Sequence, residues 1–366
     1  MAASERTVVR AAVLTAISAP LVIREIELPA PGRDEVRVRL KAAGVCHSDL
    51  SLSNGTIDQP VPAALGHEAA GVVAAVGDAV TTVGPGDNVL LNWSPACGHC
   101  WFCQHGEPYL CDKTARAWQR SYATLPDGVG LFAGLGTAAF GEETIVPESA
   151  ITRLPGGINL ESAALLGCAM LTGIGAVVNS ARVQGGESVV VFGTGGVGLS
   201  VLQGARLSRA DPVIAVDVSA EKEARARRNG ATEFILAGDQ VAKRVRELTG
   251  GRGADHAFEC VGSAQTIRQA WSSTRRGGRT TVIGIGNRTE TVAFNPLEIF
   301  YFGRVLAGSV FGATDIRRDL PRLLEHLHAG RIHPEDLVTS RISLDQLPDA
   351  LALMGAGRGA RSLVIY

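Results

Sequence analysis

The stretch "SVVVFGTGGVGLS", residues 188–200, joins a run of apolar, mostly β-branched residues to a glycine-rich turn. The run predicts a buried strand, and the residues beyond the turn predict a helix. Glycines in such a turn let the backbone approach a pyrophosphate and direct the helix N-terminus toward it. The stretch therefore predicts a dinucleotide site at Gly193, Gly195, Gly196 and Gly198.

The same alternation of strand and helix continues along the chain beyond this stretch. Apolar runs at 212–218, 254–262 and 278–286 alternate with helical segments, which predicts a parallel sheet covered on both faces. Asp217 closes the second strand, 19 residues beyond Gly198, where a carboxylate can bind both hydroxyls of an adenosine ribose. That carboxylate would repel a 2′-phosphate, so NAD is favoured over NADP, with a helix-capping acid as the alternative interpretation. Lys222 can reach the same ribose or lie on a solvated helix face.

The residues before this region show a different pattern of apolar runs and turn residues. From Thr7 to about Pro155, short β-like runs are broken by glycine and proline, which indicates a mostly antiparallel β-domain. The terminal "ARSLVIY" predicts a strand that rejoins this first domain. We therefore expect an α/β protein with a discontinuous first domain, 1–172 and 314–366, and a doubly wound dinucleotide-binding domain, 173–313.

Composition narrows the class of protein. The chain has 366 residues, with 35 basic and 36 acidic side chains, so nothing recruits nucleic acid or a membrane surface. The apolar run 11–23 is interrupted by Pro20 and continues as an alternating pattern, which predicts strands and argues against a signal peptide. No other apolar stretch is long enough to predict a membrane span. Seven cysteines, an odd number, suit a reducing compartment, and we expect a cytoplasmic protein.

Four of these cysteines are crowded within fifteen residues. Four thiolates at this spacing, on one glycine-containing loop, can close a tetrahedron around zinc and leave no open position, as a structural site requires. Disulfides and an iron–sulfur cluster are the alternatives for this loop. The predicted structural zinc ligands are Cys97, Cys100, Cys103 and Cys111.

Three other residues are candidates for a second metal site. Cys46 in "GVCHSDL", His67 in "GHEAAG" and Cys168 in "LLGCAMLTG" are far apart in the chain. Taken singly, each cysteine could be a buried thiol and the histidine a core residue. Taken together, two thiolates and one imidazole would leave zinc one open position for a water or a substrate oxygen.

The order and spacing of these motifs resemble those of the zinc-dependent medium-chain alcohol dehydrogenases over essentially the whole chain. The resemblance implies a Rossmann NAD-binding domain and a GroES-like, mostly antiparallel catalytic domain with the structural zinc loop 97–111. It also implies two zinc ions per chain, NAD as cofactor, and Cys46, His67 and Cys168 as the ligands of the catalytic zinc.

The resemblance implies further roles, residue by residue. Ser48 would pass on the substrate proton, Asp49 would orient the ligating histidine, and Glu68 would lie behind the metal. Trp93 would wall the substrate pocket. The positions matching cofactor contacts are His47 and Arg361 at the pyrophosphate and Thr172 and Val197 at the nicotinamide. Ser51 departs from the pattern, because several family members have a histidine there that carries the proton to solvent, so His47 or water would replace it here.

Substrate choice is open between two classes. The first is a primary aryl or allylic alcohol, oxidised reversibly to the aldehyde by hydride transfer to NAD. The alternative is an S-hydroxymethyl thiol adduct of mycothiol or glutathione, because "LNWSPACGHC" and "LGTAAF" also resemble thiol-dependent formaldehyde dehydrogenases. Lys113 and Arg116 could bind that adduct or be solvated loop cations.

Proteins of other classes fit the sequence less well. A zinc-free quinone reductase would lack the cysteine loop, and a zinc-ribbon binding protein would need a basic face. We therefore expect a small-molecule alcohol or aldehyde as partner, with no nucleic acid and no membrane. The resemblance also implies a homo-oligomer, and the fairly long region after Cys111 favours a dimer over a tetramer.

Overall fold

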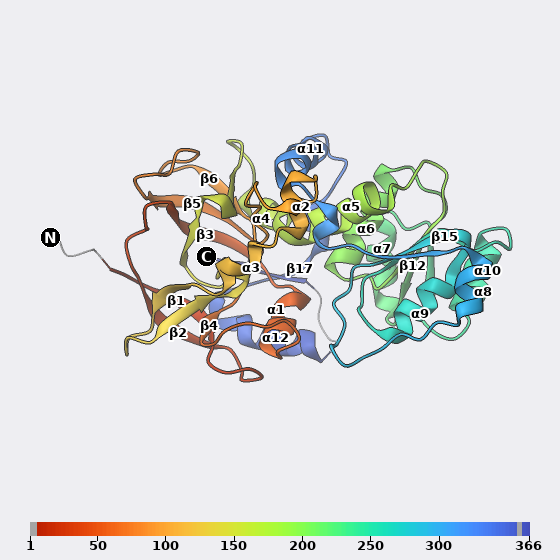
Figure 1. Cartoon of the computed structure of the whole chain (residues 1–366), viewed down its shortest axis with the longest axis horizontal. Helices are drawn as coiled ribbons and strands as arrows, with labels where there is room; N and C mark the ends of the chain where they lie inside the picture. The colour runs from red at the N-terminus through yellow and green to blue at the C-terminus, as the bar shows by residue number, and fades with distance from the viewer. Residues whose placement is uncertain (1–5, 357–360) are drawn as a thin grey trace. The chain divides into compact units, whose positions relative to one another are not determined.

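The computed structural model describes residues 6–356 and 361–366, apart from the side chains of residues 116 and 117. The chain divides into two compact units, one made of 1–168 with 338–366 and the other of 169–337. Figure 1 labels their helices and strands. The division differs from the predicted domains, since 314–337 lie in the second unit. The backbone of His333 explains this placement, because it exchanges hydrogen bonds of 2.8 and 3.1 Å with the Gln203 side chain of that unit.

The second unit contains a parallel six-stranded sheet of the kind predicted. Strand order is β13-β12-β11-β14-β15-β16, the arrangement of a doubly wound dinucleotide-binding fold. The strand β11 lies at its centre and is fully buried, as its apolar sequence predicts. The strands are β11 Val189–Phe192, β12 Val213–Asp217, β13 Glu233–Leu236, β14 Ala254–Glu259, β15 Thr274–Val282 and β16 Val305–Gly308.

Helices connect these strands, as the alternating pattern predicts. The helix α6 begins directly after the glycine turn and packs on the sheet, and the amphipathic segment near the C-terminus forms α11. The helices of this unit are α5 Leu171–Gly175, α6 Gly196–Leu207, α7 Glu223–Arg228, α8 Val241–Leu248, α9 Ala264–Ser273, α10 Pro296–Phe302 and α11 Ile316–His328.

The first unit combines a closed barrel with a mixed sheet that is mostly antiparallel. The barrel order is β1-β2-β7-β8-β4; the sheet order is β10-β6-β5-β3-β18-β17, with β9 also on β3. The apolar run near the N-terminus forms β1 and β2, as predicted. The strands are β1 Thr7–Leu14, β2 Val22–Leu28, β3 Glu35–Gly44, β4 Ala63–Ala64, β5 Ala69–Val76, β6 Asn88–Leu91, β7 Ser121–Thr124, β8 Gly130–Ala133, β9 Glu143–Pro147, β10 Ile151–Arg153, β17 Val338–Ile342 and β18 Arg361–Ile365.

The C-terminal strand stabilises the strand that leads into the first candidate metal ligand. β18 pairs antiparallel with β3, with Leu363 opposite Gly44, as the discontinuous first domain requires. The backbone N–H of Val45 also donates to the carbonyl of Ser362 at 2.9 Å. The helices of this unit are short: α1 His47–Ser53, α2 Trp101–Gln104, α3 Thr114–Trp118, α4 Leu160–Ala164 and α12 Leu347–Gly355.

One helix corrects the prediction that no further segment is apolar enough to span a membrane. Among the described residues, the continuous helix Leu160–Ala181 meets that criterion by length and composition. Of its most apolar window, 83% is buried inside the protein, which identifies it as a core helix. It includes a π-helical turn, Leu166–Met170, that carries Cys168.

Candidate functional site

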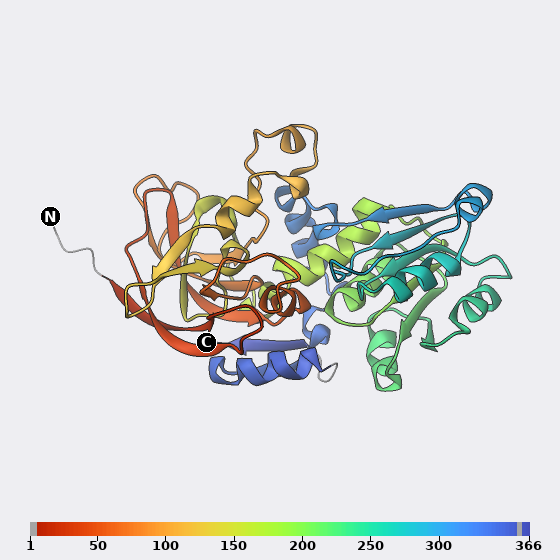
Figure 2. The same cartoon turned by 60° about the horizontal axis from the view of Figure 1, so that its bottom comes forward.

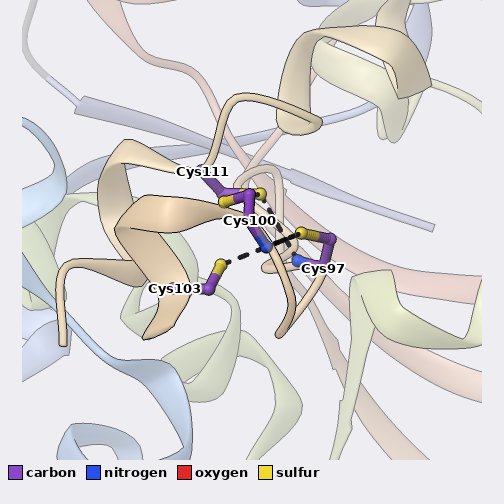
Figure 3. A group of neighbouring side chains, drawn as sticks. All are labelled: Cys97, Cys100, Cys103 and Cys111. Carbon is purple, nitrogen blue, oxygen red and sulfur yellow. Dashed lines mark hydrogen bonds between the residues drawn. The ribbon is translucent and has the colours of Figure 1, made fainter. Parts of the chain in front are cut away.

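The four clustered cysteines lie on a lobe with little regular structure. In Figure 2 this lobe stands away from the strands of its own unit. It contains only the single turn α2 and a short 3-10 turn, Pro108–Leu110. Figure 3 shows the four side chains gathered around one point, and all four sulfur atoms lie within 4.8 Å of one another.

The sulfur geometry fits a tetrahedral metal site. The Sγ atoms of Cys97 and Cys103 are 4.0 Å apart, and those of Cys100 and Cys111 are 3.9 Å apart. Four sulfurs at zinc-bonding distance would be separated by about 3.8 Å, whereas a disulfide would bring two sulfurs to about 2 Å. The thiol set therefore matches the predicted structural zinc site and disfavours the disulfide alternative.

The ionisation of these thiols also favours a cation among them. Burial is the largest single influence on Cys111 and opposes its ionisation. Hydrogen bonds from groups that include the backbone N–H of Cys97 and of Lys113 outweigh burial and lower the pKa of Cys111 to about 7. Burial raises the pKa of Cys103 to about 12, and the neighbouring thiols add to that rise. Adjacent thiolates repel one another, so all four can ionise together only around a positive charge.

The second candidate site brings together three residues from distant parts of the first unit. Cys46 follows β3 and caps α1, His67 precedes β5, and Cys168 comes from the π-helical turn. The three side chains are buried and their ligand atoms lie within 4.8 Å of one another. The His67 Nε2 atom is 3.3 Å from the Cys168 sulfur.

Asp49 connects two of these ligands from behind. Its Oδ1 lies 2.9 Å from Nδ1 of His67, and its Oδ2 accepts the backbone N–H of Cys46 at 3.0 Å. Asp49 is fully buried. The contact leaves Nε2 of the ring free to face the two sulfurs, which is the orientation that a metal-binding histidine needs.

Electrostatic interactions within this cluster favour a negative charge on the Cys46 thiol and a positive charge on the His67 ring. The hydrogen bond with Cys168 is the largest influence on Cys46 and holds its pKa well below the usual range. Burial opposes protonation of His67, but the charge and hydrogen bond of Asp49 raise its pKa to about 10. Two sulfurs and one nitrogen form a donor set that zinc accepts with a fourth position open. The residues therefore fit a catalytic zinc.

Two glycines restrict the backbone near these ligands. Gly66, which precedes His67, has a φ of +91°, and a Cβ there would meet the backbone nitrogen of Phe140. A Cβ on Gly44 would overlap the Glu68 carboxylate and approach Leu165. Both sites therefore require a residue without a side chain.

Glu68 and Arg361 form an ion pair that the sequence analysis did not anticipate. Their side chains are in contact, and both residues are buried, Glu68 fully and Arg361 with 7% exposure. The sequence assigned one residue to the metal and the other to a cofactor phosphate. No local pattern connects positions nearly three hundred residues apart.

The remaining predicted residues of this unit lie around the cluster. The Ser48 hydroxyl is 3.7 Å from the Cys46 sulfur. The Trp93 ring meets the His67 ring edge-on, with centroids 6.4 Å apart and planes at 87°. His47 is exposed and Ser51 is 4% exposed. Of the two cations considered for an adduct, Lys113 lies 3.6 Å from Asp112, and the Arg116 side chain lies outside the described residues.

The glycine turn of the second unit has the geometry of a dinucleotide cradle. Gly193 has a φ of +87°, which a tight turn between strand and helix requires. No atom lies within 4 Å of a Cβ built on Gly195, so this side of the turn is open to a ligand. A Cβ on Gly198 would overlap the carbonyl oxygen of Gly193, so α6 can pack closely only with glycine there. The turn therefore fits a pyrophosphate group.

Other predicted cofactor residues surround this turn within the second unit. Asp217 ends β12 and is 5% exposed, and the Lys222 ammonium lies 3.1 Å from its carboxylate. Thr172 is 8% exposed in α5, and Val197 lies in the first turn of α6. The Asp217 carboxylate also accepts two hydrogen bonds from Thr194, which the sequence analysis did not assign. A hydroxyl residue between two glycines of the turn is the signal that could have identified it.

Comparison with known proteins decides the family. Residues 32–156 match the alcohol dehydrogenase GroES-like domain, and residues 196–329 match the zinc-binding dehydrogenase family. An S-(hydroxymethyl)glutathione dehydrogenase of Escherichia coli is 39% identical over 369 residues, covering 98% of this chain and 99% of that protein. This chain belongs to the zinc-binding medium-chain alcohol dehydrogenases.

Solved structures of other dehydrogenases support the same family. A zinc-binding-domain alcohol dehydrogenase of Burkholderia ambifaria superimposes with a TM-score of 0.92 at 32% identity, covering 99% of each chain. Benzyl alcohol dehydrogenase of Acinetobacter calcoaceticus gives a TM-score of 0.89 at 28% identity, covering 98% of this chain and 99% of that one. The predicted Rossmann and GroES-like folds are thereby confirmed.

Membership in this family, together with the ligand geometry, assigns the metal and the cofactor class of this dehydrogenase. It is an oxidoreductase with a four-cysteine structural zinc site and a Cys46, His67, Cys168 catalytic zinc site. NAD or NADP is the cofactor class of the family, and small alcohols or aldehydes are its substrates. The iron–sulfur alternative for the cysteine loop is accordingly set aside.

Proposed function

We propose that the enzyme oxidises a primary aryl or allylic alcohol to the aldehyde, reversibly, with NAD as the hydride acceptor. The observation that carries this proposal is the Trp93 ring, which lies edge-on to the ring of the zinc ligand His67. A bulky aromatic wall beside the metal favours a flat, apolar substrate group over a charged one. Lys113, which could bind a charged group, lies 3.6 Å from Asp112.

Cys46, His67 and Cys168 would hold zinc, which would supply a Lewis acid that lowers the pKa of a bound hydroxyl group. Asp49 holds the His67 ring in the tautomer that presents Nε2 to the metal site. Ser48 relays the substrate proton: its oxygen accepts that proton as its own hydroxyl proton passes to the next group on the way to solvent, and the hydroxyl lies at the edge of the ligand cluster. The proton then reaches solvent through exposed His47 or water, since Ser51 is buried and is not a histidine.

The second unit, with its glycine turn and Asp217, binds NAD in preference to NADP. A buried carboxylate at the end of β12 can accept both ribose hydroxyls and would repel a 2′-phosphate. Lys222 assists at the same ribose, while Thr172 and Val197 pack against the nicotinamide. The family resemblance assigns pyrophosphate contacts to His47 and Arg361, and we propose the same roles here. We place the domain boundary at the division between the compact units and assign the enzyme to the cytoplasm.

A second substrate class is favoured by one specific observation. The 39% identical relative from Escherichia coli is an S-(hydroxymethyl)glutathione dehydrogenase, and the similarity covers nearly both whole chains. An S-hydroxymethyl thiol is also a primary alcohol, so the same zinc and cofactor chemistry would apply. The two classes differ in whether a thiol is needed.

The deciding experiment measures NAD reduction with several alcohols side by side. Benzyl alcohol, geraniol, ethanol, and formaldehyde with and without glutathione or mycothiol are compared by kcat/KM. We expect benzyl alcohol or geraniol to give the highest value without any thiol. Turnover that occurs with formaldehyde only when a thiol is added would replace the first proposal by the second.

The edge of the second unit's sheet supports a homodimer. The edge strand β16 pairs with β15 on one side, and its Val305 and Leu306 are each 43% exposed. The neighbouring α10 exposes Phe300 by 83% and Leu297 by 67%. An exposed apolar edge strand favours pairing with a second copy, and a twofold axis would make the two β16 strands antiparallel.

Sedimentation of the enzyme and of a Leu306→Pro variant tests this interface. Proline removes a backbone donor from β16, so the variant should sediment as a monomer while the parent sediments as a dimer. A parent protein that sediments as a monomer, or a variant that remains a dimer, would overturn the proposal.

A further inference from the structure

The carboxylate of Asp217 is held unequally at its two oxygens. Oδ2 accepts the backbone N–H of Thr194 at 2.8 Å and the Thr194 hydroxyl at 2.7 Å. Oδ1 accepts the backbone N–H of Ser219 at 3.2 Å. The Lys222 ammonium lies 3.2 Å from Oδ2 and 3.1 Å from Oδ1. Both short bonds therefore fall on Oδ2, whereas Oδ1 has only longer contacts, one of which, to Lys222, it shares with Oδ2.

This asymmetry determines which oxygen can receive a ligand. A carboxylate offers about four lone-pair sites, two on each oxygen. Oδ2 is saturated by the two donors of Thr194, and both residues are at most 5% exposed. Oδ1 has weaker bonds, one of them to a lysine whose side chain is 38% exposed and can move aside. Oδ1 is thus the oxygen that is more open to the ribose hydroxyls.

Thr194 is suited to fix this orientation. It lies between Gly193 and Gly195, and its side chain turns toward Asp217, with the residue only 3% exposed. Any residue at this position could supply the backbone N–H, but the hydroxyl requires threonine or serine. Threonine is also stiff at its first side-chain torsion, so its hydroxyl is held in place before a ligand arrives. The two hydrogen bonds together prevent the carboxylate from rotating.

We propose that Thr194 is a positioning residue that orients Asp217 for the adenosine ribose and thereby sets the preference for NAD over NADP. The proposal rests on the NAD preference stated above. The hydroxyls of an unmodified ribose need a carboxylate fixed in one orientation, because a hydrogen bond weakens steeply when its angle is wrong. A 2′-phosphate gains nothing from that orientation and is repelled less when the carboxylate can turn away.

The test is a fluorescence titration of NADH and NADPH against the purified enzyme without substrate. Thr194→Val removes the hydroxyl and keeps the shape, whereas Thr194→Ser keeps the hydroxyl. Thr232→Val is the matched control, because that hydroxyl donates to the carbonyl of Val213 at the opposite end of β12. If Thr194→Val fails to fold, Thr194→Ala is used in its place. Zinc content and melting temperature report on folding.

We expect Thr194→Val to raise the Kd of NADH roughly tenfold, the effect of losing one hydrogen bond to a charged group. The Kd of NADPH should stay the same or fall, so the ratio of the NADPH Kd to the NADH Kd should fall about tenfold. Thr194→Ser should restore the ratio, and Thr232→Val should leave it unchanged. A merely structural role for Thr194 would weaken both cofactors equally.

The outcomes separate this inference from the NAD preference. Suppose that the parent enzyme binds NADH more tightly than NADPH and that Thr194→Val has the same ratio of the two Kd values as the parent. This result would overturn the role of Thr194 and leave the NAD preference standing. Equal Kd values for NADH and NADPH in the parent enzyme would overturn the NAD preference and the inference that rests on it.

Discussion

The two zinc sites of this enzyme are supported in different ways. The structural ligands come from one segment, 97–111, whose only regular elements are a single helical turn and a short 3-10 turn. The catalytic ligands come from positions 46, 67 and 168, each at a defined place in a strand or helix framework. Asp49 adds a buried contact to two of the catalytic ligands. Among the described residues, the structural site has no comparable carboxylate.

The difference shows what each metal does for the fold. A loop without a packed core of its own depends on its metal for order. A set of ligands that strands, helices and a buried carboxylate already position needs the metal for chemistry and less for shape. Removing one zinc should therefore affect stability, and removing the other should affect turnover.

The largest expected effect is the loss of catalysis on changing a catalytic ligand. Cys168→Ala should lower the zinc content by one ion per chain and abolish turnover, because two ligands hold zinc poorly. Elemental analysis and the rate of NAD reduction measure this. Cys260→Ala is the control, since Cys260 lies outside both clusters. A Cys168→Ala enzyme with full zinc and activity would contradict the assignment.

Changing a ligand of the structural zinc should affect stability more than turnover. Cys100→Ser should remove the other zinc and lower the free energy of unfolding by several kcal/mol, because the bound metal supplies the order of the lobe. Thermal unfolding and zinc content measure this effect. Activity per folded molecule should remain within the same order of magnitude. Unchanged stability with the zinc lost would mean that the lobe is held by its own packing.

A substitution at Asp49 tests whether this carboxylate strengthens zinc binding at the catalytic site alone. Asp49→Asn should weaken zinc binding at that site by roughly 10- to 100-fold, the usual effect of losing a supporting carboxylate. Competition with a chelator measures the two zinc ions separately by their rates of release. The structural zinc should be released at the same rate in both proteins. A catalytic zinc released from the variant at the same rate as from the parent would remove the proposed distinction.

The smallest effect is expected at the missing proton exit beside the catalytic site. Ser51→His should change kcat/KM by less than about threefold and leave its pH profile in place, because residue 51 is 4% exposed. Steady-state rates across pH measure this. A shifted profile in the variant would show that position 51 can join the proton path, and His47→Gln then tests the present path.

The sequence predicts the local features of this enzyme better than the distant ones. The spacing within 97–111 and the glycine turn at 193–198 are patterns of neighbouring residues, and both are found where expected. The catalytic ligands needed a family resemblance, because nothing in local spacing connects positions 46, 67 and 168.

The features that the sequence did not predict depend on tertiary packing. The contacts of Glu68 with Arg361 and of Asp217 with Thr194 join residues from separate elements. The same holds for residues 314–337, whose amphipathic helix shows that one face is buried but not against which unit. Periodicity identifies an apolar face and leaves its partner undetermined.

The glycines at 44 and 66 restrict how this active site can evolve. A side chain at either position would collide with the Glu68 carboxylate or with the backbone of Phe140, so the ligand framework tolerates little change there. Trp93 is only partly buried and is not a ligand, so changes there should disturb the metal less than changes at either glycine. A mutational library that spares positions 44 and 66 and randomises position 93 should therefore keep most members folded and zinc-loaded while it samples new substrates.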